Sequence, residues 1–170
     1  MGNISKILDI RITRNYTSKT FELNQEQYIN KFLTKFGFSN RIYKLISFSI
    51  DSYKDLCPDI STDNRIDAIW YREIIESVIY TMIYIRPDIV FAFERLSQYI
   101  QDLYKYYKYT VCCILRYFKS SISTRISFRS KGNFVIYSDA DYTTDKSDRK
   151  SITVSISLLG EEPVFWASKK

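Results

Sequence analysis

The 170-residue sequence predicts an α+β fold, in which an N-terminal β-hairpin and helices are followed by an antiparallel three-stranded meander. Three patterns support this prediction. Apolar and charged residues alternate over residues 8–12, which is typical of a strand. Apolar residues then recur at helical spacing between residues 69 and 118. Finally, apolar residues alternate with Ser and Thr over residues 151–159, which indicates a half-buried strand of an antiparallel sheet.

The hairpin is predicted from two strand patterns, residues 7–12 and 20–23, which are joined by a polar turn. A helix is expected to begin at Asn24, because Asn24 and Gln27 have the spacing of a capping box. Gly37 is a typical helix stop. Residues 39–67 show little periodicity and indicate a connection between modules.

Three helices are predicted in the middle of the chain, at residues 69–85, 88–100 and 104–118. The first is apolar around most of its circumference, so we expect it to be buried. The sequence Arg86-Pro87-Asp88 separates the first two helices, since Pro is tolerated at the first helical position and Asp suits the first turn.

Short strand patterns follow the last helix, at residues 125–128, 134–137 and 164–167. Together with residues 151–159 and two Gly-containing turns, they predict that residues 133–170 form the meander.

The composition excludes several kinds of chemistry. Because the chain has no His, Ser-His and Cys-His nucleophiles and His-ligated zinc sites are excluded. Its three Cys lack C-x-x-C spacing, and Cys112 and Cys113 are expected to be small apolar residues of a helix. The start of the chain shows no secretory signal, and the most apolar run, residues 74–85, is too short to span a membrane. We therefore expect an intracellular protein, in the cytoplasm or nucleus, that is neither secreted nor bound to a membrane.

Positive charge is concentrated in the second half of the chain. Residues 1–85 carry 11 basic and 10 acidic groups, whereas residues 86–170 carry 14 and 9. Residues 103–138 contain seven basic residues and no acid. Such a run suits nucleic acid, although a solvated helix face followed by loops would have the same composition. The predicted nucleic-acid-binding residues are Lys105, Lys108, Arg116, Lys119, Arg125, Arg129 and Lys131.

Two carboxylates follow the apolar part of the first meander strand. Asp139 and Asp141 are two residues apart, so both could face the same side of the sheet. Carboxylates beside a basic segment suit metal-assisted cleavage of phosphodiesters, since Mg²⁺ prefers oxygen ligands. The alternative is that Asp is simply a common turn residue. Asp139 and Asp141 are thus candidate metal ligands, with Mg²⁺ as the cofactor.

Taken in order, several segments resemble the C-terminal part of a copia-type retrotransposon Pol polyprotein. Residues 8–10 resemble the Leu-Gly-Ile of the reverse transcriptase primer-grip strand, with Asp9 in place of the glycine. Residues 23–38 resemble the thumb helix that follows it. Four further segments resemble the helical part of the family, namely residues 70–80, 86–89, 95–98 and 114–119. Three more resemble the start of its RNase H domain, namely residues 137–141, 148–151 and 166–170.

The resemblance implies three consecutive segments. Residues 1–60 would be a reverse transcriptase primer-grip and thumb-like segment, residues 61–122 a connection-like helical segment, and residues 123–170 a partial RNase H-like domain. The meander would then be an incomplete RNase H-like sheet. In RNase H the first catalytic carboxylate ends the first strand, and Asp139 is the position that matches. The resemblance places the polymerase aspartates before Met1 and the remaining RNase H acids after Lys170, so we expect the chain to be inactive alone.

Three functions are open at this point. The first is a fragment of the reverse transcriptase/RNase H region that binds nucleic acid, an RNA–DNA hybrid or a duplex, without sequence preference. Its further partners would be other parts of the element's polyprotein. The second is a Mg²⁺-dependent RNase H that acts on RNA–DNA hybrids as part of a longer product. The third is a co-opted module that meets a protein partner through its aromatic helices.

Overall fold

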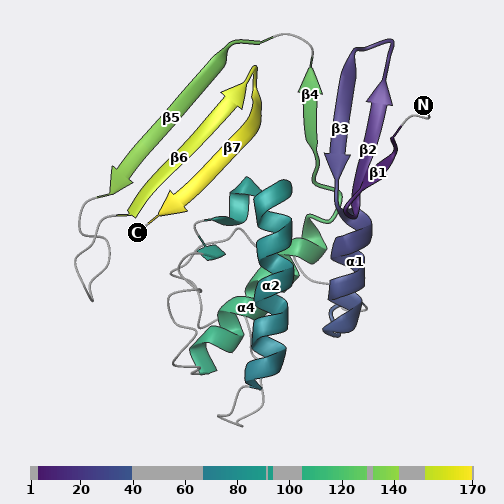
Figure 1. Ribbon diagram of the computed structural model, residues 1–170. Coiled ribbons are helices and arrows are strands. Elements are labelled where there is room, and N and C mark those ends of the chain that lie inside the picture. The colour runs from purple at the N-terminus through teal and green to yellow at the C-terminus, as the bar shows by residue number, and fades with distance from the viewer. Residues whose placement is uncertain are drawn as a thin grey trace.

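The computed structural model describes residues 4–39, 67–90, 92–93, 105–129, 132–141 and 152–169. Within these residues the chain forms two antiparallel sheets and a group of helices, so the α+β prediction is confirmed (Figure 1). The connection predicted at residues 39–67 lies, except at its ends, outside the described residues.

The first sheet has the order β1-β2-β3-β4, and its strands are β1 (Lys6–Ile7), β2 (Ile10–Asn15), β3 (Thr20–Asn24) and β4 (Ile126–Arg129). The predicted hairpin is β2 and β3. The fourth strand comes from far along the chain and pairs antiparallel with β3, with Leu23 opposite Ile126. The sheet therefore joins the N-terminal hairpin to the residues that follow the last helix.

The prediction of one unbroken strand over residues 7–12 was wrong. Leu8 and Asp9 form a two-residue turn between β1 and β2, since Ile7 pairs with Ile10. Both turn residues have left-handed backbone angles, with φ of 47° and 60°. Turns of this kind favour Asn-Gly, because glycine adopts positive φ at no steric cost. This geometry accounts for the glycine that the copia-type motif has at the position of Asp9.

The helices are α1 (Glu26–Lys35), α2 (Ala68–Tyr84), the short 3₁₀ helix η1 (Pro87–Ile89) and α4 (Lys105–Ser120). They confirm the predicted helices, although the one expected at residues 88–100 is described only in its first turns. The capping box did not form. Asn24 is the last residue of β3, where it pairs with Arg11, so the N-cap is Gln25, which makes no side-chain cap, and α1 begins at Glu26.

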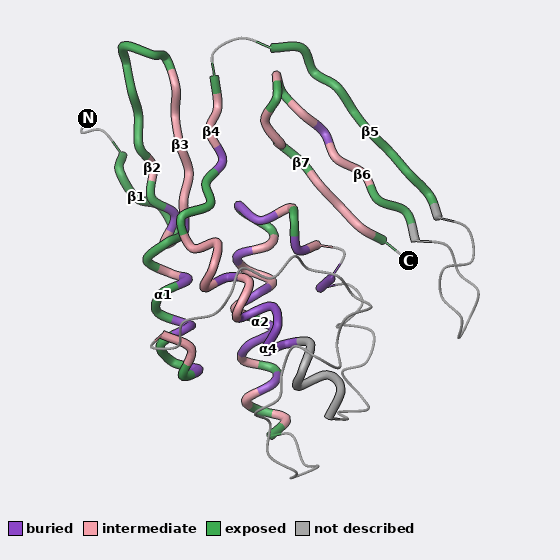
Figure 2. Tube along the Cα trace, turned by 180° about the vertical axis from the view of Figure 1, so that it is seen from behind, coloured by how far each residue is buried: buried purple, intermediate pink, exposed green. Residues whose placement is uncertain are grey.

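The main core lies among α1, α2 and α4, where buried residues gather (Figure 2). Phe32 of α1 meets Phe118 of α4 edge to face, with ring centroids 5.3 Å apart. Cys112 and Cys113 are buried in α4, as predicted for small apolar helix residues.

A fully buried Arg86 connects α2, η1 and α4. Its guanidinium donates to the Asp88 carboxylate at 2.8 and 2.9 Å and to the Ser121 hydroxyl at 2.7 Å. It also lies over the rings of Tyr117 and Phe118, about 5 Å from each centroid. Burial alone would raise the pKa of Asp88, but the hydrogen bonds and charge of Arg86 outweigh it and hold that pKa below its ordinary value.

The second sheet is the predicted meander, β5 (Phe134–Asp141), β6 (Ile152–Leu159) and β7 (Glu162–Lys169), in the order β5-β6-β7. It contacts the rest of the molecule through β7, where the Trp166 indole N–H donates to the Met82 carbonyl at 2.9 Å. Gly132 lies so close to the backbone of Gly160 that a Cβ at Gly132 would overlap it. β5 is the outer strand, on the side away from β4 (Figure 1).

Candidate nucleic-acid interface and carboxylate pair

The α4 helix brings four predicted cations onto one face. At about 100° per residue, Lys105, Lys108, Arg116 and Lys119 fall within about 80° of arc. At about 1.5 Å per residue, the first and last of them are about 21 Å apart along the helix axis. The helix sequence contains no acidic residue. Its periodicity therefore aligns the cations in a stripe.

This basic stripe is not a freely exposed surface over its whole length. The middle of α4, from Val111 to Leu115, is buried on every side. Arg116 is only partly exposed and has contacts of its own. The side chains of Lys105 and Lys108 lie outside the described residues.

The other three predicted cations, Arg125, Arg129 and Lys131, follow α4 in the sequence. Arg125 is exposed and donates to the Glu22 carboxylate at 3.0 Å, so part of its charge is neutralised. Arg129, at the end of β4, is exposed and has no ion pair among the residues that the structure describes. Lys131 lies outside the described residues. Four of the seven predicted residues thus belong to α4 and one, Arg129, to β4, while Arg125 comes just before β4.

Asp139 and Asp141 both lie near the end of β5, on the same face of the sheet. Two positions before Asp139, Tyr137 shares its face with the indole of Trp166, because Tyr137, Ile156 and Trp166 are paired in register. That is the face whose Trp166 packs against the first sheet. Asp139 therefore does not point to the outer side of the meander, and its side chain is exposed.

A complete metal site is not formed by the described residues. Within the described ranges there is no cluster of three or more Cys, Asp or Glu side chains that could hold an ion. The side chain of Asp141 and all of residues 142–150 lie outside those ranges. Among the described side chains, Asp139 is a single exposed carboxylate at this end of β5. No described helix is long and apolar enough to cross a membrane.

Two cations that the sequence interpretation missed, Arg14 and Lys19, lie at the tip of the β2–β3 hairpin. They line an open hollow of about 340 Å³, which we call the hairpin hollow. The residues that line the hairpin hollow are Arg14, Asn15, Tyr16, Lys19, Thr20, Phe21, Phe128 and Arg129. Basic and aromatic residues alternate over residues 14–21, and this pattern indicates the hollow in the sequence. The pattern is short and Glu22 follows directly, so these residues do not form a long acid-free run.

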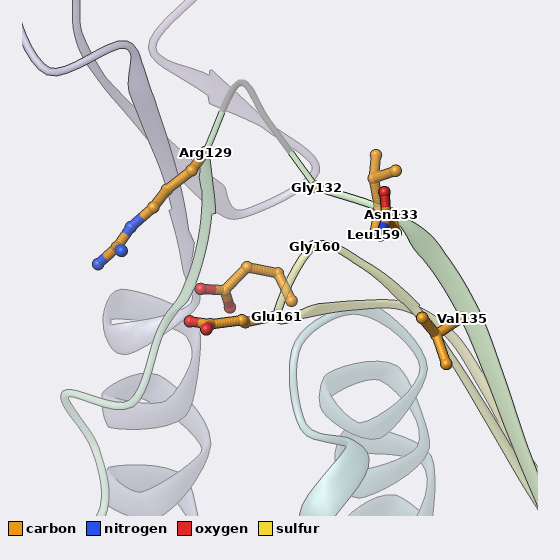
Figure 3. Close-up of a pocket in the computed structure, with 8 residues that line it drawn as sticks. Arg129, Gly132, Asn133, Val135, Leu159, Gly160 and Glu161 are labelled. Carbon is orange, nitrogen blue, oxygen red and sulfur yellow. The ribbon is translucent and has the colours of Figure 1, made fainter.

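A second hollow of about 440 Å³ lies between the end of β4 and the β6–β7 turn (Figure 3). It is lined by Arg129 together with Glu161 and Glu162. In Figure 3 the Arg129 guanidinium extends away from Gly132 and Gly160. Arg129 thus lines both hollows, and acids line only the second.

Comparison with known proteins gives several similar sequences. The retrovirus-related Pol polyprotein from transposon TNT 1-94 of Nicotiana tabacum is 28% identical in an alignment of 175 positions, which covers 99% of this chain and 13% of that polyprotein. The corresponding polyprotein from transposon RE1 of Arabidopsis thaliana is 38% identical over 107 residues, 61% of this chain and 7% of the polyprotein. The secreted RxLR effector protein 161 of Plasmopara viticola is 31% identical over 102 residues, 59% of this chain and 72% of that protein. No family model matches the sequence, and no solved structure matches it.

Proposed function

The chain belongs to the Pol polyprotein family of copia-type retrotransposons, and we propose that it is a part of the reverse transcriptase/RNase H region that binds nucleic acid without sequence preference. It spans only 13% and 7% of the tobacco and Arabidopsis polyproteins, so their overall activities do not transfer to it directly. We further propose that the chain catalyses no reaction alone.

The basic stripe of α4 is the observation that carries this proposal. Cations on one helix face, here in two pairs about 12 Å apart along the axis, can contact phosphates of a backbone, and neutralising phosphates releases counterions. Binding of this kind depends on charge spacing and not on base edges, so it carries no sequence information. The ligand would be an RNA–DNA hybrid or another duplex.

The test is a fluorescence anisotropy titration of a labelled RNA–DNA hybrid at several salt concentrations. For three to four neutralised phosphates, we expect the logarithm of the affinity to fall with the logarithm of salt concentration with a slope of about −3. The double variant Lys105→Gln/Lys108→Gln should reduce that slope by roughly two, because it removes two phosphate contacts.

A matched control is Lys31→Gln/Lys35→Gln, which removes the same charge from α1, where the two lysines pair with Asp9 and Glu73. This control should leave the slope nearly unchanged. An affinity that does not respond to salt, or equal effects of the two double variants, would contradict a binding site on α4.

The pair Asp139 and Asp141 favours a second candidate function, a ribonuclease H site that acts on RNA–DNA hybrids within a longer product. Its support is the exposed carboxylate of Asp139 near the end of β5, with Asp141 two positions further along the same strand. The described side chains offer fewer ligands than Mg²⁺ needs, so they do not form a catalytic site by themselves. Incubating the chain with a hybrid and Mg²⁺ should release no product. Cleavage that Asp139→Ala abolishes would instead establish the second candidate.

The outer face of the meander supports contact with other parts of the polyprotein. Phe134, Ile136 and Phe165 lie on that face and are each about 60% exposed. Exposed apolar groups of this size are typical of surfaces that another chain covers.

With nucleic acid and the polyprotein as partners, the proposed location is the cytoplasm or nucleus. A tagged chain that accumulated in the culture medium of expressing cells would contradict this location.

A further inference from the structure

The hairpin hollow carries positive charge, and no acidic side chain among the residues that line it neutralises that charge. Arg14, Lys19 and Arg129 are exposed, and none of them has an ion pair within the described ranges. No acidic residue lines this hollow. Cations that line one hollow without acids attract a polyanion. Arg14 is opposite Phe21 and Arg129 is opposite Thr20, so these two side chains start from opposite faces of the sheet and reach the hollow from different sides.

Aromatic rings lie beside these cations. Phe21 and Phe128 are opposite each other on β3 and β4, and their rings stack with centroids 5.0 Å apart. Arg14 is paired with Phe21 in register and so projects from the same face of the sheet. Tyr16, at the hairpin tip, is 68% exposed, so its ring is free to accept a further flat group.

The turn that carries Tyr16 and Lys19 is held by its own hydrogen bonds. The Asn15 carboxamide oxygen accepts from the backbone N–H groups of Thr17 and Ser18 at 3.0 and 3.1 Å. Lys19 has a positive φ of 52°, a conformation in which L residues are uncommon. The backbone that carries Tyr16 and Lys19 is therefore ordered before a ligand binds, which lowers the entropy cost of binding.

We propose that the hairpin hollow binds single-stranded nucleic acid. One base stacks on Tyr16, while the cations Arg14, Lys19 and Arg129 contact the adjoining phosphates. Stacking on an exposed ring needs a base that is not already stacked in a duplex, which selects a single strand over a duplex. The volume of about 340 Å³ lies near the lower end of small-ligand pockets and suits one nucleotide. This inference rests on the proposed function, and it adds a second surface, of different strand preference, to the α4 stripe.

The experiment compares a labelled ten-residue oligothymidine with a blunt twenty-base-pair duplex, both titrated with the full chain. Tyr16→Ala should lower the affinity for the oligothymidine about 5- to 100-fold, the range for loss of one stacked base, and Tyr16→Phe should keep it. The triple variant Arg14→Gln/Lys19→Gln/Arg129→Gln should reduce the salt slope for the single strand by about 2, at about 0.7 per phosphate. Neither change should alter duplex affinity more than twofold.

The control triple variant is Arg11→Gln/Lys35→Gln/Arg72→Gln, which removes two Arg and one Lys from exposed positions outside the hollow. Both triple variants should keep the wild-type circular dichroism spectrum and urea midpoint, because all the altered side chains are exposed. Phe21 and Phe128 are left unchanged, since their stacking supports the sheet.

The possible results separate this inference from the proposed function. If the wild-type chain binds neither oligonucleotide, both proposals fail. If it binds the duplex through α4 but the two triple variants bind the single strand equally well, only the hairpin hollow fails. Equal losses for single strand and duplex would show a general phosphate contact, and would overturn the assignment to a single strand.

Discussion

Replacing Asp88 by Ala tests how the buried Arg86 is stabilised. The guanidinium of Arg86 is completely shielded from solvent, and Asp88 is its acidic partner, at 2.8 Å. Removing one partner of a buried pair leaves an uncompensated charge, which costs about 3–5 kcal/mol when both partners are buried. The Asp88 side chain is 35% exposed, and Arg86 keeps its bonds to Ser121, so we expect a loss of about 2–3 kcal/mol.

Urea unfolding followed by circular dichroism measures this loss. The matched control is Glu73→Ala, which removes the acid of the exposed Lys35–Glu73 pair and should cost about 0.5 kcal/mol or less. The double variant Arg86→Met/Asp88→Ala removes both charges and fills the site with an apolar side chain of similar reach. It should be more stable than Asp88→Ala alone.

The pH dependence follows from the lowered pKa of Asp88. A carboxyl whose pKa is lower in the folded state contributes stability above its unfolded value of about 3.8, and this contribution is lost as the pH falls through the folded pKa. The difference in unfolding free energy between wild type and Asp88→Ala should therefore be constant from pH 7 to about pH 5 and shrink below about pH 4. A loss under 1 kcal/mol at pH 7, or a double variant less stable than the single one, would refute this account of Arg86.

Three further predictions concern the turns and the junction between the sheets. Gly132→Ala should destabilise the chain by about 2 kcal/mol in urea unfolding, because its Cβ would overlap the backbone of Gly160; an unchanged midpoint would contradict that close approach. Trp166→Phe should cost about 1 kcal/mol, the net value of its hydrogen bond to the Met82 carbonyl, and no loss would mean that this bond does not hold the meander in place. Leu8→Asn should raise the unfolding free energy by about 0.5–1 kcal/mol, since Asn tolerates the left-handed backbone better than Leu, whereas a lower melting temperature would exclude the proposed turn.

Much of the local structure was predictable because the pattern of apolar residues repeats with the period of each element. The helical spacing after residue 68 and the alternation over residues 152–159 correspond to α2 and β6. The Leu8-Asp9 turn was missed because a two-residue turn leaves the alternation intact, and because Leu8 is an unusual residue at positive φ and no glycine follows it. The capping box was missed because pairing of Asn24 with Arg11 extends the strand through the cap position.

The two candidate nucleic-acid sites also differ in how far the sequence predicts them. The stripe on α4 follows from helical periodicity, so the sequence spacing alone predicts that its four cations lie on one face of the helix. The hairpin hollow could not be predicted in this way, because Arg129 reaches the hollow lined by Arg14 and Lys19 only when β4 pairs with β3.

The sequence by itself determined most of the elements and their order, since each depends on residues that are close together along the chain. It also determined the resemblance to copia-type Pol polyproteins, which depends on the order of matching segments along the chain. The tertiary structure decided which strands share a sheet, that Arg86 is buried, and which cations line the hairpin hollow. Those outcomes depend on burying apolar surface between distant segments, and that free energy depends on the whole packed arrangement and not on any one local pattern.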